Sequence, residues 1–81
     1  MIFKAKVIVK LKDSVLDPQG QTILHALHEQ GYNTLKNLRA GKIFFIEIEE
    51  NSKESAEKLL SEIAHKVLSN PVIETYEVVV E

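Results

Sequence analysis

Hydrophobic and polar residues alternate along residues 3–12, the first regular stretch of the chain. The odd positions are apolar, and every even position except Ile8 is a lysine. Such a period of two is typical of a strand with one buried face. The same period returns at 43–50 and 74–80 and, more weakly, at 35–40, where Gly41 and Lys42 resemble a turn. The pattern therefore predicts four strands.

A helix is predicted to begin after Asp17. The Asp17 carboxylate can accept hydrogen bonds from free backbone N–H groups, and Pro18 suits the first helical position, which needs no N–H. Ile23, Leu24 and Leu27 then share one face. Gly31 is a natural residue to end this helix.

A second helix is predicted after residue 50. Asn51 and Glu54 have the spacing of a capping box. Asn70 and Pro71 end the helix, because a residue before proline avoids the helical conformation. Apolar residues recur between these limits at helical spacing: Ala56, Leu59, Leu60, Ile63, Ala64, Val67 and Leu68.

The order of predicted elements is β-α-β-β-α-β, in one domain spanning residues 1–81. This is the order of the α+β ferredoxin-like fold. We therefore expect a four-stranded antiparallel sheet with two helices on one face. The first and third predicted strands should be neighbours at its centre.

The opposite face of this sheet is predicted to carry an apolar patch. Ile8, Ile43, Phe45 and Val79 alternate out of phase with the core residues. Leaving such side chains in water forgoes about 1.5–3 kcal/mol each. We therefore hypothesise self-association through this patch; scattered apolar residues are, however, also common on monomers.

Composition narrows the classes of function. The chain has no cysteine, hence no disulfide, and neither a signal peptide nor an apolar run long enough to span a membrane, so a cytoplasmic location is expected. Residues 1–42 hold seven Lys or Arg and three Asp or Glu, a net charge of +4; residues 43–81 hold three and nine, a net charge of −6. This asymmetry could steer docking, or reflect two differently solvated faces.

Catalytic and metal-binding patterns are missing from the sequence. His25 and His28 lie three residues apart on the first predicted helix, without the further ligands that a metal site needs. There is no glycine-rich phosphate loop and no spacing that suggests a Ser-His-Asp arrangement. Catalysis by this chain alone is therefore not expected.

Two binding modules share this order of elements. An RNA-recognition motif stacks bases on aromatic side chains of its central strands. Ile8 and Ile43 occupy such positions here, so we expect no nucleic-acid binding. The chain is also similar to ACT-like dimers, which bind amino acids near the first strand–helix turn. Its "LDPQG" at 16–20 has the Asp, Pro and Gly of such turns, although a capped helix requires similar residues, so amino-acid binding stays an alternative function.

Several short strings occur in a specific order along residues 10–74. They are Lys10-Leu11-Lys12, Val15-Leu16-Asp17-Pro18-Gln19-Gly20, Gly31, Arg39 with Gly41-Lys42, and Asn70-Pro71-Val72-Ile73-Glu74. With these strings the sequence resembles the PurS-type small subunit of phosphoribosylformylglycinamidine synthase, an enzyme of purine biosynthesis. "LDPQG" and "NPVIE" are the most specific of them.

The resemblance implies a non-catalytic subunit in a three-component enzyme. A glutaminase subunit releases ammonia, and a synthetase subunit uses it with ATP. The small subunit bridges the two and is itself a dimer or tetramer. ATP, magnesium and glutamine would belong to the partners, and this chain would hold no cofactor.

The resemblance also suggests where the partners bind. Gln19 and Gly20 are not needed to start a helix, and glycine in a first turn suits the close approach of another backbone. We hypothesise that the matched strings form the partner contacts: Asp17, Pro18, Gln19, Gly20, Arg39, Gly41, Lys42, Asn70 and Pro71.

Overall fold

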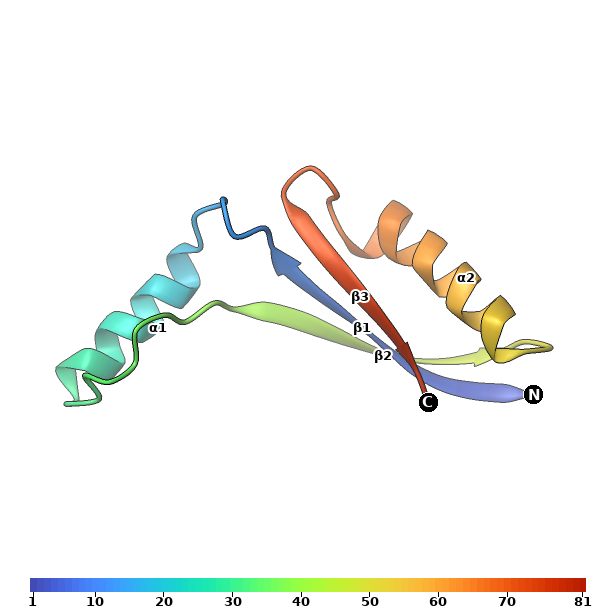
Figure 1. Cartoon of the computed structure of the whole chain (residues 1–81), viewed down its shortest axis with the longest axis horizontal. Helices are drawn as coiled ribbons and strands as arrows, with labels where there is room; N and C mark the ends of the chain where they lie inside the picture. Colours follow the sequence, from blue (N-terminus) through green and yellow to red (C-terminus); the bar gives the residue numbers. More distant parts are fainter.

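The computed structural model describes residues 1–81 and contains three strands and two α-helices (Figure 1). In chain order they are β1 (Ile2–Leu11), α1 (Pro18–Glu29), β2 (Gly41–Glu49), α2 (Lys53–Ile63) and β3 (Glu74–Val80). A π-helical turn, Ala64–Leu68, continues α2. Neither α-helix has the length and apolar character needed to cross a membrane.

β1 is the central strand of an antiparallel sheet with the order β2-β1-β3. In this register Lys6 of β1 lies opposite Phe45 of β2 and Val79 of β3. The prediction that the first strand pairs with the strand near residues 43–50 is confirmed. The strand predicted at residues 74–80 is confirmed as well.

The predicted four-stranded sheet is wrong, because residues 35–40 form no strand. Gly41 and Lys42, predicted as a turn, pair with Lys10 and Val9 as the first residues of β2. The chain therefore runs straight into β2, and no hairpin can fold residues 35–40 onto its edge. These residues instead run back alongside α1, where Nε2 of His28 lies 2.7 Å from the Leu35 carbonyl oxygen (Figure 1).

The prediction of two helices on one face is also wrong. α2 packs against β1 and β3, whereas α1 stands beyond the end of the sheet and makes no extended interface with it (Figure 1). The molecule is elongated, with extents of 51 × 25 × 14 Å. We call residues 12–40 the arm, and the sheet together with α2 and the π-helical turn the body.

The core lies between α2 and the facing side of the sheet, the inner face. Five residues there have no exposed surface, and the largest of them are Val7 and Val9 of β1 and Leu60 of α2. Only nine of 81 residues are buried, which is a small core even for a short domain.

The helix ends follow local chemistry. Asp17 caps α1 as predicted, and Gly31, with a φ of +97°, follows its last turn. The capping residue of α2 is Ser52, not Asn51; the Ser52 hydroxyl accepts from the Ser55 amide at 3.1 Å. The predicted Asn51–Glu54 capping box is therefore wrong by one position.

Candidate functional site

The arm meets the body at one end of the sheet, and the strings that carry the resemblance meet there, except for Gly31, which lies at the far end of α1. The chain leaves the body after Leu11 and returns at Gly41. The Lys12 amide donates to the Ile73 carbonyl oxygen at 2.8 Å, which holds the loop before β3 beside the leaving chain. Residues 17–20, 39–42 and 70–74, far apart in sequence, thus surround one region, which we call the joint.

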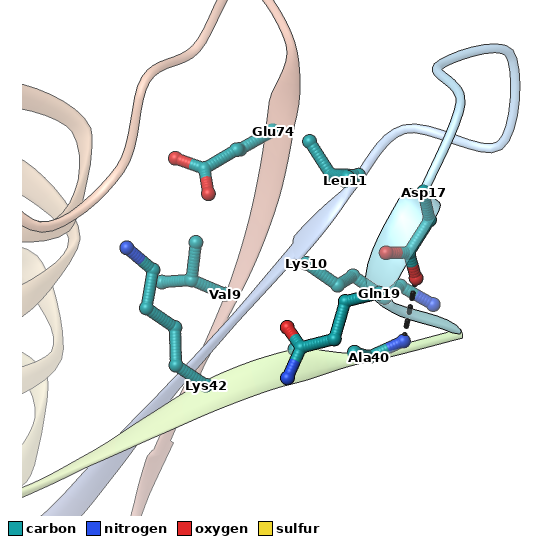
Figure 2. Close-up of a pocket in the computed structure, with 9 residues that line it drawn as sticks. Val9, Lys10, Leu11, Asp17, Gln19, Ala40, Lys42 and Glu74 are labelled. Atoms are coloured by element: carbon teal, nitrogen blue, oxygen red, sulfur yellow. Dashed lines mark hydrogen bonds between the residues drawn. The ribbon is translucent and has the colours of Figure 1, made fainter. Parts of the chain in front are cut away.

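Asp17 links two of these segments. Its side chain is buried, with 3% of the residue exposed. One carboxylate oxygen accepts from the Gly20 amide at 3.1 Å, and the other accepts from the Ala40 amide at 2.7 Å (Figure 2). The bond from Ala40 and then that from Gly20 lower the pKa of Asp17 below 3.8. Asp17 is therefore both a helix cap and a tie to the returning chain.

Arg39 links the same segments in the opposite direction. Its Nη2 group donates to the Lys12 carbonyl oxygen at 3.0 Å and to the Val15 carbonyl oxygen at 2.7 Å. The guanidinium is part-buried and is bound to carbonyls of its own chain.

Gly20, at the start of α1, lies very close to the backbone of the chain that returns to the body at Gly41. A Cβ at this position would lie 2.5 Å from the Leu38 carbonyl oxygen and 2.5 Å from an Asp17 carboxylate oxygen. Real Cβ atoms do not come this close, so only glycine fits without movement of the backbone. The backbone that approaches Gly20 belongs to the chain itself.

A hollow of about 390 Å³ opens beside the joint (Figure 2). Gln19, at the start of α1, and Lys42 of β2 are exposed on its wall, and Glu74 of β3 is half-buried there. Lys42 pairs with Val9 and Glu74 with Leu11, so both charged side chains lie on the inner face, beyond the part that α2 covers. The hollow offers opposite charges and an amide, which suit contacts with a polar protein surface.

The Asn70–Pro71 turn is exposed on the loop before β3. The Asn70 side-chain oxygen accepts from the Val72 amide at 3.1 Å, and its carbonyl oxygen accepts from the Glu74 amide at 2.7 Å. Asn70 therefore shapes this turn. Pro71 and Val72 project from it into solvent.

The predicted apolar patch lies on the outer face of the sheet, opposite α2. Ile8 pairs with Ile43, and Lys6 separates Phe45 from Val79 in the next row. Phe45 is 77% exposed and Ile43 is 44% exposed, while Ile8 and Val79 are half-buried. The structure thus places the four residues together, and self-association through them stays a prediction.

The sequence analysis missed a second uncovered apolar surface, on the arm. Ile23, predicted to share a face with Leu24 and Leu27, is exposed, and so are Tyr32 and Leu35 on the chain that follows α1. It also missed the bonds across the joint, because Asp17 and Ala40 are 23 residues apart and no local pattern joins them.

No three His, Cys, Asp or Glu side chains lie together in a way that could hold a metal ion. The histidines of the arm make local contacts: Nε2 of His25 lies 3.0 Å from the Glu29 carboxylate. What the joint offers is a hydrogen-bonded turn flanked by exposed polar groups.

A known protein family matches almost the whole chain. The family model described as "PurS: Phosphoribosylformylglycinamidine (FGAM) synthase" matches residues 4–81. The chain belongs to the PurS family. The PurS subunit of phosphoribosylformylglycinamidine synthase from Bacillus subtilis (strain 168) is 44% identical to it over 80 residues, which cover 99% of this chain and 94% of the relative.

Solved structures of PurS proteins have the same fold as this chain. The crystal structure of PurS from Methanocaldococcus jannaschii, a subunit of formylglycinamide ribonucleotide amidotransferase, superposes with a TM-score of 0.87 at 43% identity, covering 98% of this chain and 95% of that one. A chain in the PurLQS structure from Thermotoga maritima gives a TM-score of 0.92 at 36% identity, covering 100% and 99%. The elongated shape is thus shared with experimentally determined PurS structures.

The pKa of Asp17 predicts a pH dependence of stability. Since folding lowers this pKa, the stabilising contribution of Asp17 is complete above about pH 5 and is lost as the pH falls through the folded-state pKa. We expect Asp17→Asn to lower the urea midpoint at neutral pH. The difference from the wild type should shrink between about pH 5 and pH 2, where the carboxylate of the wild type becomes protonated.

Urea titrations of both proteins across this range, followed by circular dichroism, measure that difference. Asp13→Asn, on the exposed loop before Asp17, controls for the loss of one negative charge. A difference between Asp17→Asn and the wild type that stays constant down to pH 2 would contradict the role of the carboxylate.

Proposed function

We propose that this chain is the non-catalytic bridging subunit of phosphoribosylformylglycinamidine synthase. In this role it couples the glutaminase subunit to the ATP-dependent synthetase subunit. The observation that carries the proposal is the match over the whole chain to a PurS chain in a structure named PurLQS, at a TM-score of 0.92. The family model, which matches 78 of 81 residues (4–81), supports it independently.

Ammonia passed between two active sites is lost if water reaches the path, because it is protonated or escapes. A bridging subunit that keeps both enzymes in contact and the path closed therefore has a physical advantage. ATP, magnesium and glutamine are used by the partner subunits. The family match favours this function over amino-acid binding and RNA binding.

The partner contacts are proposed to lie around the joint. Pro18, Gln19, Gly41, Lys42 and the Asn70–Pro71 turn are exposed there and can reach another protein. The buried or part-buried members of the same strings are Asp17, Gly20 and Arg39. These three support the contact surface from within.

Self-association belongs to the same proposal. Two apolar surfaces have no cover within the chain: the outer-face patch around Phe45, and the side of the arm that exposes Ile23 and Leu35. α1 has no sheet to pack on, while the inner face has no second helix to cover it. A second copy supplies a sheet for α1 and a helix for the inner face, and its own outer-face patch can pack against that of the first copy.

A cytoplasmic location fits this function. ATP and the phosphoribosylated substrate that the resemblance assigns to the synthetase are cytoplasmic metabolites.

Reconstitution tests the proposed function. The synthetase and glutaminase from the same organism are assayed for formylglycinamidine ribonucleotide synthesis with and without this chain, with either glutamine or ammonium as the nitrogen source. We expect glutamine-dependent synthesis to require the chain and ammonium-dependent synthesis not to require it. Equal glutamine-dependent rates with and without the chain would refute the proposal.

A further inference from the structure

The arm is joined to the body by two chain segments and little else. The leaving segment follows Leu11 and the returning segment precedes Gly41. α1 makes no extended interface with any strand, so side-chain packing does not hold the arm at a fixed angle. Within one chain, the contacts that fix this angle therefore lie at the joint.

Three hydrogen bonds cross between the leaving and returning segments. Asp17, on the leaving segment, accepts from the Ala40 amide. Arg39, on the returning segment, donates to the carbonyl oxygens of Lys12 and Val15. The bonds run in both directions, which restricts rotation of one segment past the other. A fourth bond, from the Gly20 amide to Asp17, ties the start of α1 to the same carboxylate.

The close fit at Gly20 adds a steric constraint. Its Cα lies so near the Leu38 carbonyl oxygen that a Cβ would approach it to 2.5 Å. The first turn of α1 is thereby pressed against the returning segment. This contact and the crossing bonds fix how the two segments lie beside each other where they leave the sheet. Since the Lys12 amide is bonded to the Ile73 carbonyl oxygen of the body, they restrict the direction that the arm takes from β1 and β2.

We propose that Asp17 and Arg39 are positioning residues that fix the angle between the arm and the body. Through this angle they determine how the exposed groups of the joint and the apolar side of the arm are presented to other chains. A contact surface that is rigid before binding loses less conformational freedom on association. This proposal concerns the isolated polypeptide and does not rest on the proposed function.

The length of α1 amplifies any change at the joint. A helix rises about 1.5 Å per residue, so α1, with 12 residues, is about 18 Å long. A rotation of about 15° at the joint therefore moves the far end of α1 by about 5 Å. A change of this size is measurable between two spin labels by pulsed electron paramagnetic resonance.

The chain contains no cysteine, so two introduced cysteines are the only labelling sites. Ala26→Cys on α1 and Glu57→Cys on α2 are both exposed and report the arm–body distance. Glu57→Cys with Thr75→Cys reports a distance within the body. Labelled chains are diluted into excess unlabelled chains, so that only distances within one chain are measured whether or not the chain self-associates.

The arm–body distance is compared among the otherwise unaltered chain, Arg39→Ala and Asp17→Ala. Lys36→Ala is the matched control, because Lys36 also lies on the returning segment but bonds only to Asn33 nearby. We expect the arm–body distribution to shift or broaden by about 3 Å or more in both test variants, because Ala26 lies about 12 Å along α1 from Pro18 and a rotation of about 15° moves it by about 3 Å. It should not change in Lys36→Ala, and the distance within the body should not change in any variant.

Conservative variants separate positioning from general loss of stability. Asp17→Asn keeps one side-chain oxygen as an acceptor, and Arg39→Lys keeps one cationic donor. We expect both to give distributions between those of the wild type and the alanine variants, and they serve as the test if an alanine variant does not fold. An unchanged arm–body distribution in the folded variants overturns the proposal. An equal change within the body overturns it as well.

Discussion

Leu60→Ala is expected to lower the free energy of unfolding by about 2–5 kcal/mol, the range found when a large buried side chain is removed from a core. Leu60 lies on α2, has no exposed surface, and packs with Ala5 and Val80. Phe3, Ile46, Ile48 and Val78 complete this cluster. The neighbours come from all three strands, so removing the leucine leaves a cavity at the centre of the body.

The small core makes this loss severe. Stabilities of about 0.05–0.15 kcal/mol per residue correspond to about 4–12 kcal/mol for a chain of this size. The expected loss is thus a large fraction of the total. Urea unfolding at several protein concentrations measures it, because self-association adds a concentration-dependent contribution to stability.

Leu59→Ala is the matched control for Leu60→Ala. It makes the same chemical change one residue earlier on α2, where the side chain is 37% exposed. We expect its destabilisation to be less than half that of Leu60→Ala, since less surface leaves water when Leu59 folds. Similar losses for the two variants would show that the core does not centre on Leu60.

Local patterns were sufficient to predict most elements. The alternation in β1 and β3, the cap at Asp17 and the stop at Gly31 depend on neighbouring residues, and the structure has them where expected. The outer-face patch was also predictable, because strand alternation places side chains on opposite faces. Pairing of β1 with β2 then brought Ile8 next to Ile43.

The sheet and the place of α1 could not be predicted in the same way. Residues 35–40 alternate too weakly to distinguish an edge strand from an extended segment, and Gly41 suits a turn as well as a strand. Whether α1 covers its own sheet depends on contacts between distant residues. The position of α1 depends on bonds at the joint, such as that from the Ala40 amide to Asp17, which no spacing in the sequence reveals.

That the residues of the matched strings contact partner subunits stays a prediction, and the structure shows that their surroundings differ. All the matched strings except Gly31 meet where the arm joins the body. Within them, Gln19 and Lys42 are exposed, whereas Asp17 and Arg39 are bound to the chain itself. The extent of burial separates the residues that can contact a partner from those that hold the chain together. Burial depends on the tertiary structure and cannot be read from the strings themselves.

Phe45→Glu is expected to weaken self-association by about 100-fold or more. Burying an aromatic side chain of this size contributes about 1.5–3 kcal/mol, and a two-fold symmetric interface counts each substituted residue twice. The expected loss is therefore about 3–6 kcal/mol, more than the 2.7 kcal/mol that corresponds to 100-fold. Phe45 projects from the outer face with 77% of its surface exposed, so the isolated fold does not depend on it.

Sedimentation velocity over a range of concentrations measures this change, and circular dichroism verifies that the body is still folded. Phe45→Leu is the control, since it keeps an apolar side chain and should weaken association far less. Ile23→Glu tests the arm in the same way, because Ile23 is exposed on α1, away from the outer face. If Phe45→Glu sediments like the wild type while Ile23→Glu does not, copies meet through the arm and the outer face is free for the partner subunits. If neither variant changes the particle, self-association through both surfaces is refuted.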